Sequence, residues 1–221
     1  MTGRLSTRPL LPAARGAPGV HRLPAGAGRA PLLFVPASYS DNAAWPLVVS
    51  LHGAGGVPDR GLSLLQALAD KERFLVLAPA SHRQTWDLIV DSFGPDVQAL
   101  DSALQWTFER YCVKPDVLAI GGFSDGASYA LSVGVINGDL FTHVLAFSPG
   151  FLRALKPHGR PKIYVSHGTG DRVLPIDACS RRIVPQLKRA GYDVTYKEFE
   201  GGHTVPEEQR REAVNLFMGR K

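Results

Sequence analysis

The stretch GGFSDGASYA, residues 121–130, indicates the fold of this chain. Gly122 and Gly126 flank Ser124 two positions away on either side, after the apolar residues 116–120 and before a helical pattern. A serine at a sharp strand-to-helix turn has a strained backbone, and side chains two positions away would collide there. The glycines therefore predict a nucleophile elbow rather than a plain helix N-cap at Ser124.

Apolar runs typical of strands occur on both sides of this stretch. Several contain unbroken Val, Leu and Ile, as strands buried on both faces do. They alternate with helical patterns, which predicts a mostly parallel sheet with helices on both faces. The predicted strands span residues 31–36, 46–53, 74–80, 116–124, 142–148, 161–168 and 193–200.

Helical patterns separate these strands. The pattern at 177–190 begins at Asp177, a good N-cap, and stops before Gly191. Pro185 lies inside this pattern and is expected to kink or divide the helix, because proline lacks the amide hydrogen. The other predicted helices cover residues 62–69 and 97–111, the residues after the elbow serine, and the residues after Pro206.

One end of the chain carries the whole charge imbalance. The 221 residues include 25 basic and 20 acidic ones, a net charge of +5. Residues 1–40 contain five arginines and no acid, so the remainder is balanced and we expect no nucleic-acid partner. We expect an irregular, solvated basic segment at 1–20, followed by a single domain at 21–221. A tether to nucleic acid or to an acidic surface is one alternative. A transit peptide is another, which the prolines and glycines disfavour because they interrupt an amphipathic helix.

No segment is suited to span a membrane. Apolar runs fall short of the roughly 18–20 residues that a span needs, and the N-terminus shows no secretory signal. Cys112 and Cys179 do not form a disulfide or zinc pattern, and we expect two small buried residues in a reducing, cytoplasmic compartment. The seven histidines show no H-x-x-x-H spacing, so no metal is expected. The sequence leaves the oligomeric state open.

Three polar side chains follow predicted strands. Ser124, Asp171 and His203 each come at or just after the end of one. Because sites in parallel sheets lie at the carboxyl ends of strands, we expect these side chains to meet. A nucleophile, an acid and a base in this chain order match the α/β-hydrolase arrangement. The alternatives are a turn-forming role for Asp171 and a surface loop position for His203.

The glycine-rich stretch SLHGAGG, residues 50–56, follows another predicted strand. Acyl transfer develops an oxyanion, which needs preorganised hydrogen-bond donors. The backbone N–H groups of Asp125 and Ala54 are the candidate donors, since the glycines let the backbone approach closely. An ordinary glycine-rich turn is the alternative. We expect His52 to support this loop and His167 to pack under the turn at Asp171.

Four motifs together resemble a known family. LHGAGG, GFSDG, HGTGDRVLP and GGHTVP look like those of the phospholipase/carboxylesterase group of serine esterases, with acyl-protein thioesterases and feruloyl-esterase-like enzymes as relatives. The resemblance implies an α/β-hydrolase fold, no cofactor, and a triad of Ser124 as nucleophile, His203 as base and Asp171 as acid. The chain departs at Asp125, where that group often has glutamine, and at Ala54, where it has bulkier residues. Both positions adjoin the pocket and bear on acyl-chain preference.

The expected activity is hydrolysis of a small-molecule carboxylic ester through an acyl-enzyme. The segment 148–160 is too short for a folded cap, so we expect no lid domain and an open site for short, medium or aromatic acyl groups. Thioesterase or lysophospholipase-like hydrolysis is the alternative activity, and a non-enzymatic binding protein is a third. The candidate substrate-binding residues, for which ordinary packing is the alternative, are Trp86, Phe123 and Phe151, with Leu88, Ile89, Phe93, Leu152 and Leu155 as further groove candidates.

Overall fold

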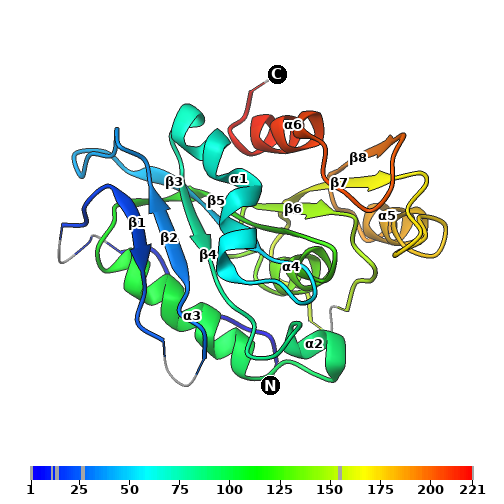
Figure 1. Ribbon diagram of the computed structural model, residues 1–221, viewed down its shortest axis with the longest axis horizontal. Coiled ribbons are helices and arrows are strands. Elements are labelled where there is room, and N and C mark those ends of the chain that lie inside the picture. Colours follow the sequence, from blue (N-terminus) through cyan, green and yellow to red (C-terminus); the bar gives the residue numbers. More distant parts are fainter. Residues whose placement is uncertain (1, 11, 13–14, 26–27, 154–155, 221) are drawn as a thin grey trace.

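The computed structural model describes residues 2–10, 12, 15–25, 28–153 and 156–220 (Figure 1). Within this part of the chain, eight strands form one sheet in the order β1-β2-β4-β3-β5-β6-β7-β8. The strand β2 runs antiparallel to β1 and β4, and the remaining neighbours are parallel. The strands are β1 Gly19–Arg22, β2 Leu32–Val35, β3 Trp45–Leu51, β4 Leu75–Ala78, β5 Val113–Phe123, β6 His143–Phe147, β7 Lys162–Gly168 and β8 Val194–Phe199.

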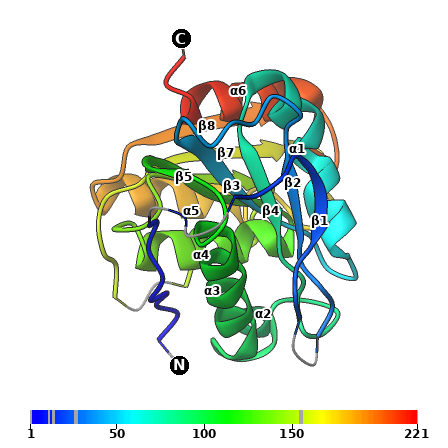
Figure 2. The ribbon, with the colours of Figure 1, turned by 90° about the vertical axis from the view of Figure 1, so that its left-hand side faces the viewer.

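Helices cover both faces of this sheet, as the alternating pattern predicts. Figure 2 shows α1 and α6 on one side and α3 and α4 on the other. The buried residues of α5 join the same core as those of α3 and α4, and those of α1 and α6 share a second core. The helices are α1 Pro58–Glu72, α2 Asp87–Val90, α3 Pro95–Phe108, α4 Asp125–Ile136, α5 Ser180–Arg189 and α6 Glu207–Phe217.

The central strand β5 and the helix after it position the elbow. Ile120 faces the core on the α4 side and Ala119 the core on the opposite side, and both are fully buried. In α4, every residue from Gly126 to Ile136 is buried, so this helix is enclosed on all sides. The turn between β5 and α4 is therefore held between two rigidly packed elements.

The helix α5 differs from its sequence prediction at its start and at its proline. It begins at Ser180 rather than at Asp177, because the Asp177 carboxylate pairs with Arg181 instead of capping an amide. Pro185 lies inside α5 without dividing it. The Pro185 side chain is on the exposed side of the helix. Proline has no N–H, so one helix carbonyl lacks its usual donor, and water can supply that hydrogen bond on the exposed side.

Residues 4–8 are not the solvated segment that the sequence analysis expected. Leu5 is 2% exposed and its N–H donates to Asn137 Oδ1 at 2.8 Å. Arg4 and Arg8 both pair with the carboxylate of Asp139. This segment therefore docks on the C-terminal end of α4, and its arginines are neutralised by a contact 131 or more residues away in sequence.

Two short elements, β1 and α2, were not predicted. The residues of β1 are mostly exposed and form the antiparallel edge of the sheet, so they lack the apolar run of an inner strand. Among the described helices, none is both long enough and apolar enough to cross a bilayer.

Candidate active site

Ser124 lies at a strained turn between β5 and α4. Its backbone φ is 58° and ψ is −122°, a region that residues with a Cβ rarely adopt. A Cβ on Gly126 would lie 2.5 Å from the carbonyl oxygens of Leu51 and His52, and one on Gly122 would lie 2.7 Å from the Gly126 backbone. The prediction that both glycines give clearance is confirmed.

Ser124, His203 and Asp171 form one hydrogen-bonded row. The Ser124 hydroxyl lies 2.8 Å from His203 Nε2, and His203 Nδ1 lies 2.6 Å from Asp171 Oδ2. Ser124 is 8% exposed and the His203 side chain 15%, so solvent reaches both. The sheet thus brings a serine hydroxyl, an imidazole and a carboxylate into one hydrogen-bonded row.

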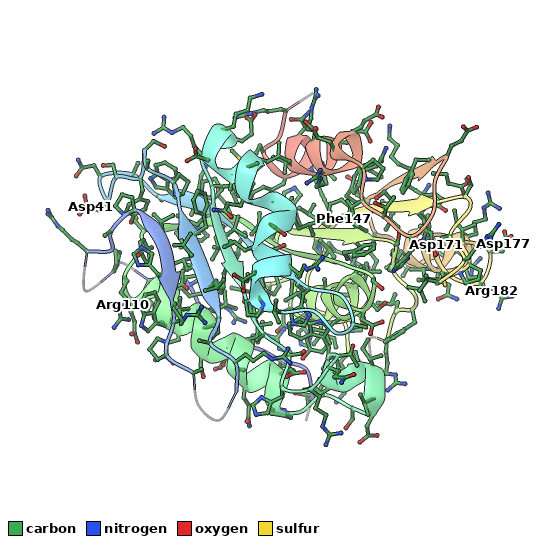
Figure 3. All side chains as sticks on the ribbon, viewed as in Figure 1. Asp41, Arg110, Phe147, Asp171, Asp177 and Arg182 are labelled. Carbon is green, nitrogen blue, oxygen red and sulfur yellow. The ribbon has the colours of Figure 1, made fainter. Side chains whose placement is uncertain are left out.

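The loops after β7 and β8 are bonded to each other, and this places Asp171 beside His203. The amides of Thr169 and Gly170 donate to the carbonyls of Phe199 and Gly201. Asp171 lies beyond the end of β7 (Figure 3). Adjacent parallel strands therefore explain why residues 32 positions apart meet.

Asp171 keeps its charge although it is buried. Its Oδ1 accepts hydrogen bonds from the N–H groups of Val173 and Leu174, both at 2.9 Å. Burial raises the pKa of Asp171, but the hydrogen bonds from His203, Leu174 and Val173 outweigh burial and hold this pKa below its ordinary value. The carboxylate is therefore ionised at neutral pH and faces the His203 ring.

The loop that contains Ala54 passes close to the elbow. A Cβ on Gly53 would lie 3.3 Å from Ser124 Cβ. Asp125 is the first residue of α4, where amides have no partner within the helix. The Ala54 N–H has no hydrogen-bond partner among the described residues. Both predicted oxyanion donors therefore belong to residues next to Ser124: Asp125 follows it in sequence, and Ala54 follows Gly53, which lies close to it.

His52 supports this loop, as predicted. Its Nδ1 donates to the Gly53 carbonyl at 2.8 Å, and its Nε2 accepts the Ser81 amide at 3.1 Å. Burial lowers the pKa of His52, so the ring stays neutral in this arrangement.

Trp86 does not line a groove, and its prediction as a substrate-binding residue is wrong. The side chain is fully buried and its Nε1 donates to the His52 carbonyl at 2.9 Å. Its ring stacks on Tyr129 with ring centroids 5.0 Å apart. The residues predicted with it, Leu88 and Phe93, are also buried. Trp86 is thus part of the support under the Ala54 loop.

The other substrate-binding candidates lie in partly buried positions. The Phe123 ring lies 4.6 Å from the His203 ring, measured between centroids, and is half-buried. Phe151, Leu152 and Ile89 are also half-buried and pack against the core. Leu155 lies outside the described residues. The Phe123 ring therefore packs against the triad-like row.

Three contacts at the elbow and the Ala54 loop escaped the sequence analysis. The Thr85 hydroxyl donates to Asp125 Oδ2 at 2.6 Å, and Arg29 Nη1 donates to the Gly56 carbonyl at 2.9 Å. The Gly55 amide also donates to the Gln84 carbonyl. Nothing in the local sequence marks these residues, because each acts on a loop far away along the chain.

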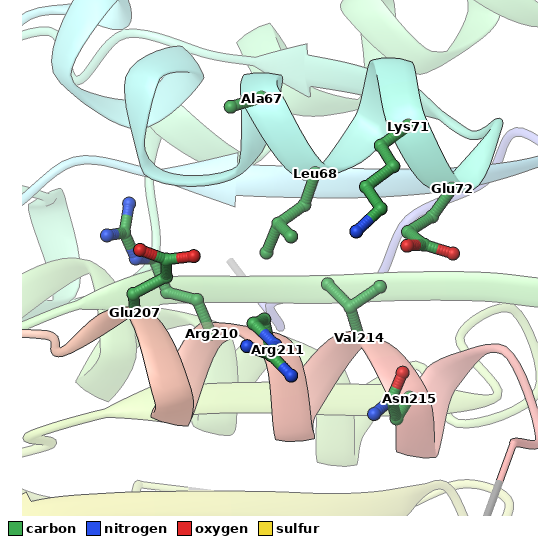
Figure 4. Close-up of a pocket in the computed structure, with 9 residues that line it drawn as sticks. All are labelled: Ala67, Leu68, Lys71, Glu72, Glu207, Arg210, Arg211, Val214 and Asn215. Carbon is green, nitrogen blue, oxygen red and sulfur yellow. The ribbon is translucent and has the colours of Figure 1, made fainter.

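A cavity of about 450 Å³ lies between α1 and α6 and contains none of the predicted site residues (Figure 4). In the described part of the chain, no group of three or more His, Cys, Asp or Glu side chains is arranged to hold a metal ion. The cavity is lined by Ala67, Leu68, Lys71, Glu72, Glu207, Arg210, Arg211, Val214 and Asn215.

Comparison with known proteins identifies the fold. No family model and no curated protein matches the chain. Solved structures do match: esterase PE8 is 22% identical with a TM-score of 0.70, over 86% of this chain and 97% of that one. The CE1 ferulic acid esterase AmCE1/Fae1A from the anaerobic fungus Anaeromyces mucronatus is 19% identical with a TM-score of 0.67, over 93% and 91%. The Bacillus cereus carboxylesterase is 18% identical with a TM-score of 0.66, over 86% and 93%. The chain has the α/β-hydrolase fold of these structures.

Proposed function

We propose that this chain is a serine carboxylesterase that hydrolyses small-molecule esters through an acyl-enzyme. The observation that carries the proposal is the hydrogen-bonded row from Ser124 through His203 to Asp171. The strained φ of Ser124 adds to it, because such strain is kept where the surrounding structure requires it. The fold alone would not decide the activity, since one fold hosts many functions.

The proposed reaction uses the same three residues in both half-cycles. His203 Nε2 takes the proton of the Ser124 hydroxyl as the oxygen attacks the ester carbonyl. Asp171 holds the imidazole in the Nδ1–H tautomer and stabilises the imidazolium. The Ala54 and Asp125 amides donate to the oxyanion. His203 then gives the proton to the leaving alcohol, and water repeats the sequence to release the acid.

Short, medium or aromatic acyl groups are the proposed substrates. Segment 148–160 between β6 and β7 has no helix or strand among its described residues, so no cap covers the site there. A long acyl chain in an open groove leaves apolar surface in water, which costs about 0.8 kcal/mol of binding free energy for each unburied CH₂. AmCE1/Fae1A is a ferulic acid esterase, and one of its structures contains ferulic acid. Hydroxycinnamate esters therefore belong in the test panel.

The decisive experiment replaces Ser124 with alanine. Hydrolysis of nitrophenyl acetate, butyrate, octanoate and palmitate and of a hydroxycinnamate ester is measured for wild type and Ser124→Ala. We expect kcat to fall by roughly 10⁴- to 10⁶-fold and fluorophosphonate labelling to disappear. The exposed Ser63→Ala variant should behave as wild type in both assays.

Two outcomes would count against the proposal. A folded Ser124→Ala protein that keeps a tenth of the activity would show that another group is the nucleophile. A steady rise in kcat/KM through palmitate, or a preference for thioesters over the matching oxygen esters, would point to the lysophospholipase-like or thioesterase alternative.

A further inference from the structure

His167 has a position that the proposed reaction does not use. It is the penultimate residue of β7, and its side chain is fully buried. Its Nε2 lies 2.8 Å from the Leu174 carbonyl oxygen and 3.2 Å from Asp171 Oδ2. Its Nδ1 lies 2.7 Å from the hydroxyl of Ser180, the first residue of α5.

These neighbours determine which nitrogen of His167 carries the hydrogen. A carbonyl oxygen and an ionised carboxylate only accept hydrogen bonds, so Nε2 must donate. The Leu174 carbonyl is the nearer acceptor, and the positive end of the same N–H lies beside Asp171 Oδ2. The Ser180 hydroxyl then donates to the unprotonated Nδ1. Burial lowers the pKa of His167, which agrees with a neutral ring.

The same hydrogen bond completes a closed set of contacts around the carboxylate. Leu174 donates its N–H to Asp171 Oδ1 and accepts the Nε2 hydrogen of His167 at its carbonyl. His167 thereby ties the turn that binds one carboxylate oxygen to the end of β7. It also faces the second oxygen, Oδ2, which accepts from His203. Both oxygens of Asp171 are therefore oriented through His167.

We propose that His167 is a positioning residue for Asp171: its Nε2 hydrogen holds the turn at Leu174 and faces the carboxylate oxygen that His203 uses. The role rests on the proposed function, because orienting Asp171 matters only if His203 acts as the base. Without the donor, the turn at Leu174 is held less firmly, and the hydrogen bond between Asp171 and His203 loosens.

The first test needs neither a substrate nor an activity measurement. Histidine ¹⁵N–¹H correlation spectra of the wild-type protein report which ring nitrogen is protonated, with the His167 signal assigned by its loss in His167→Gln. We expect Nε2 protonated and Nδ1 unprotonated from pH 6 to pH 8. A ring protonated at Nδ1, or at both nitrogens, overturns the proposal.

The second test compares two replacements of His167. Leucine removes the donor at similar size, whereas glutamine places an amide N–H near the position of Nε2. A short N–H···carboxylate hydrogen bond shifts its proton far downfield, so the His203 Nδ1 hydrogen reports the contact with Asp171. We expect this resonance to move upfield or disappear in His167→Leu and to persist in His167→Gln.

The activity of the same variants should follow the resonance. We expect kcat to fall roughly 10- to 100-fold in His167→Leu with KM within about twofold, and to recover most of this loss in His167→Gln. Unchanged resonance and kcat in His167→Leu overturn the proposal, and so does an equal loss in both variants, because ring volume would then explain it.

Two further observations separate a folding defect and a failure of the proposed function from a failure of this proposal. If His167→Leu does not fold, the tautomer of the wild-type ring decides in its place, because a ring protonated at Nδ1 alone has no Nε2 hydrogen to donate to Leu174 and overturns the proposal. If the wild type hydrolyses no ester, the proposed function fails, while the tautomer and the His203 resonance still test the arrangement around Asp171.

Discussion

A buried carboxylate keeps its charge only where donors replace the water it loses. Asp171 is 5% exposed, and two backbone amides and the His203 ring supply those donors. The two amides come from the turn that Asp171 itself begins. The two roles predicted for Asp171, turn former and acid, are therefore compatible, because the turn orients the carboxylate.

Asp171→Asn should lower kcat by roughly 10⁴-fold while the protein stays folded. The amide oxygen of asparagine can still accept from Val173 and Leu174, but its NH₂ faces His203 Nδ1 and favours the wrong imidazole tautomer. The measurement is kcat for nitrophenyl butyrate, with circular dichroism as the fold control. Combined with Ser124→Ala, the two losses should not add. A fully active variant would place the acid elsewhere, and Asp193 would be tested next.

Among the elements, backbone packing at the elbow is tighter than side-chain packing. The start of α4 lies against the end of β3 so closely that Gly126 has backbone oxygens on the side where a Cβ would point. Backbone cannot rotate away as a flexible side chain can. Glycine is therefore required by the approach of two elements, in addition to the strained φ of the neighbouring serine.

Gly126→Ala should destabilise the protein by roughly 3 kcal/mol or more, because its Cβ would meet two carbonyl oxygens at 2.5 Å. Urea unfolding followed by tryptophan fluorescence measures the change. The matched control is Gly28→Ala, whose Cβ would have only the His82 ring within ordinary contact distance. Equal stability of the two variants would mean that β3 and α4 can separate at no cost.

At the scale of the whole molecule, residues near both ends of the chain pack against the rest of the fold. Residues 4–8 dock on α4 through Leu5 and the pairing of two arginines with Asp139. At the other end, α6 covers the sheet, and its Phe217 ring meets the His143 ring of β6 edge-on at 5.6 Å between centroids. Burial, with Lys162 on the neighbouring strand, lowers the pKa of His143 to about 4.

This shift makes the fold sensitive to acid. An unfolded histidine titrates near pH 6.5, so below that pH the unfolded chain takes up a proton that the folded protein binds only near pH 4. The His143 contribution is complete above pH 6.5 and is lost as pH falls toward about 4. His143→Phe should therefore lose less stability than wild type in urea unfolding between pH 7 and pH 4.

The exposed His158→Gln variant is the control for this measurement and should follow the wild-type curve. His52 and His167, whose pKa values burial also lowers, act in the same direction in all three proteins. The difference between wild type and His143→Phe is thus due to His143. Parallel curves for the two would contradict the prediction.

The sequence by itself determined the order of the strands and helices other than β1 and α2, and which residues meet at the strand ends. Strand and helix periodicity is local, and so is the glycine spacing around Ser124. Because parallel strands put their carboxyl ends at one edge, these local signals also predicted that Asp171 and His203 come close to the serine, and the observed distances agree. Their catalytic roles stay predictions.

Only the tertiary structure decided which neighbours each side chain has. It showed that Trp86 is buried and supports the Ala54 loop instead of lining a groove. It also showed that Leu5 docks on α4 and that His167 Nε2 lies against the Leu174 carbonyl. The local sequence around an apolar or ionisable residue near a strand end does not show whether its side chain faces solvent or the core. Burial and hydrogen-bond partners depend on contacts between distant segments, which exist only once the chain has folded.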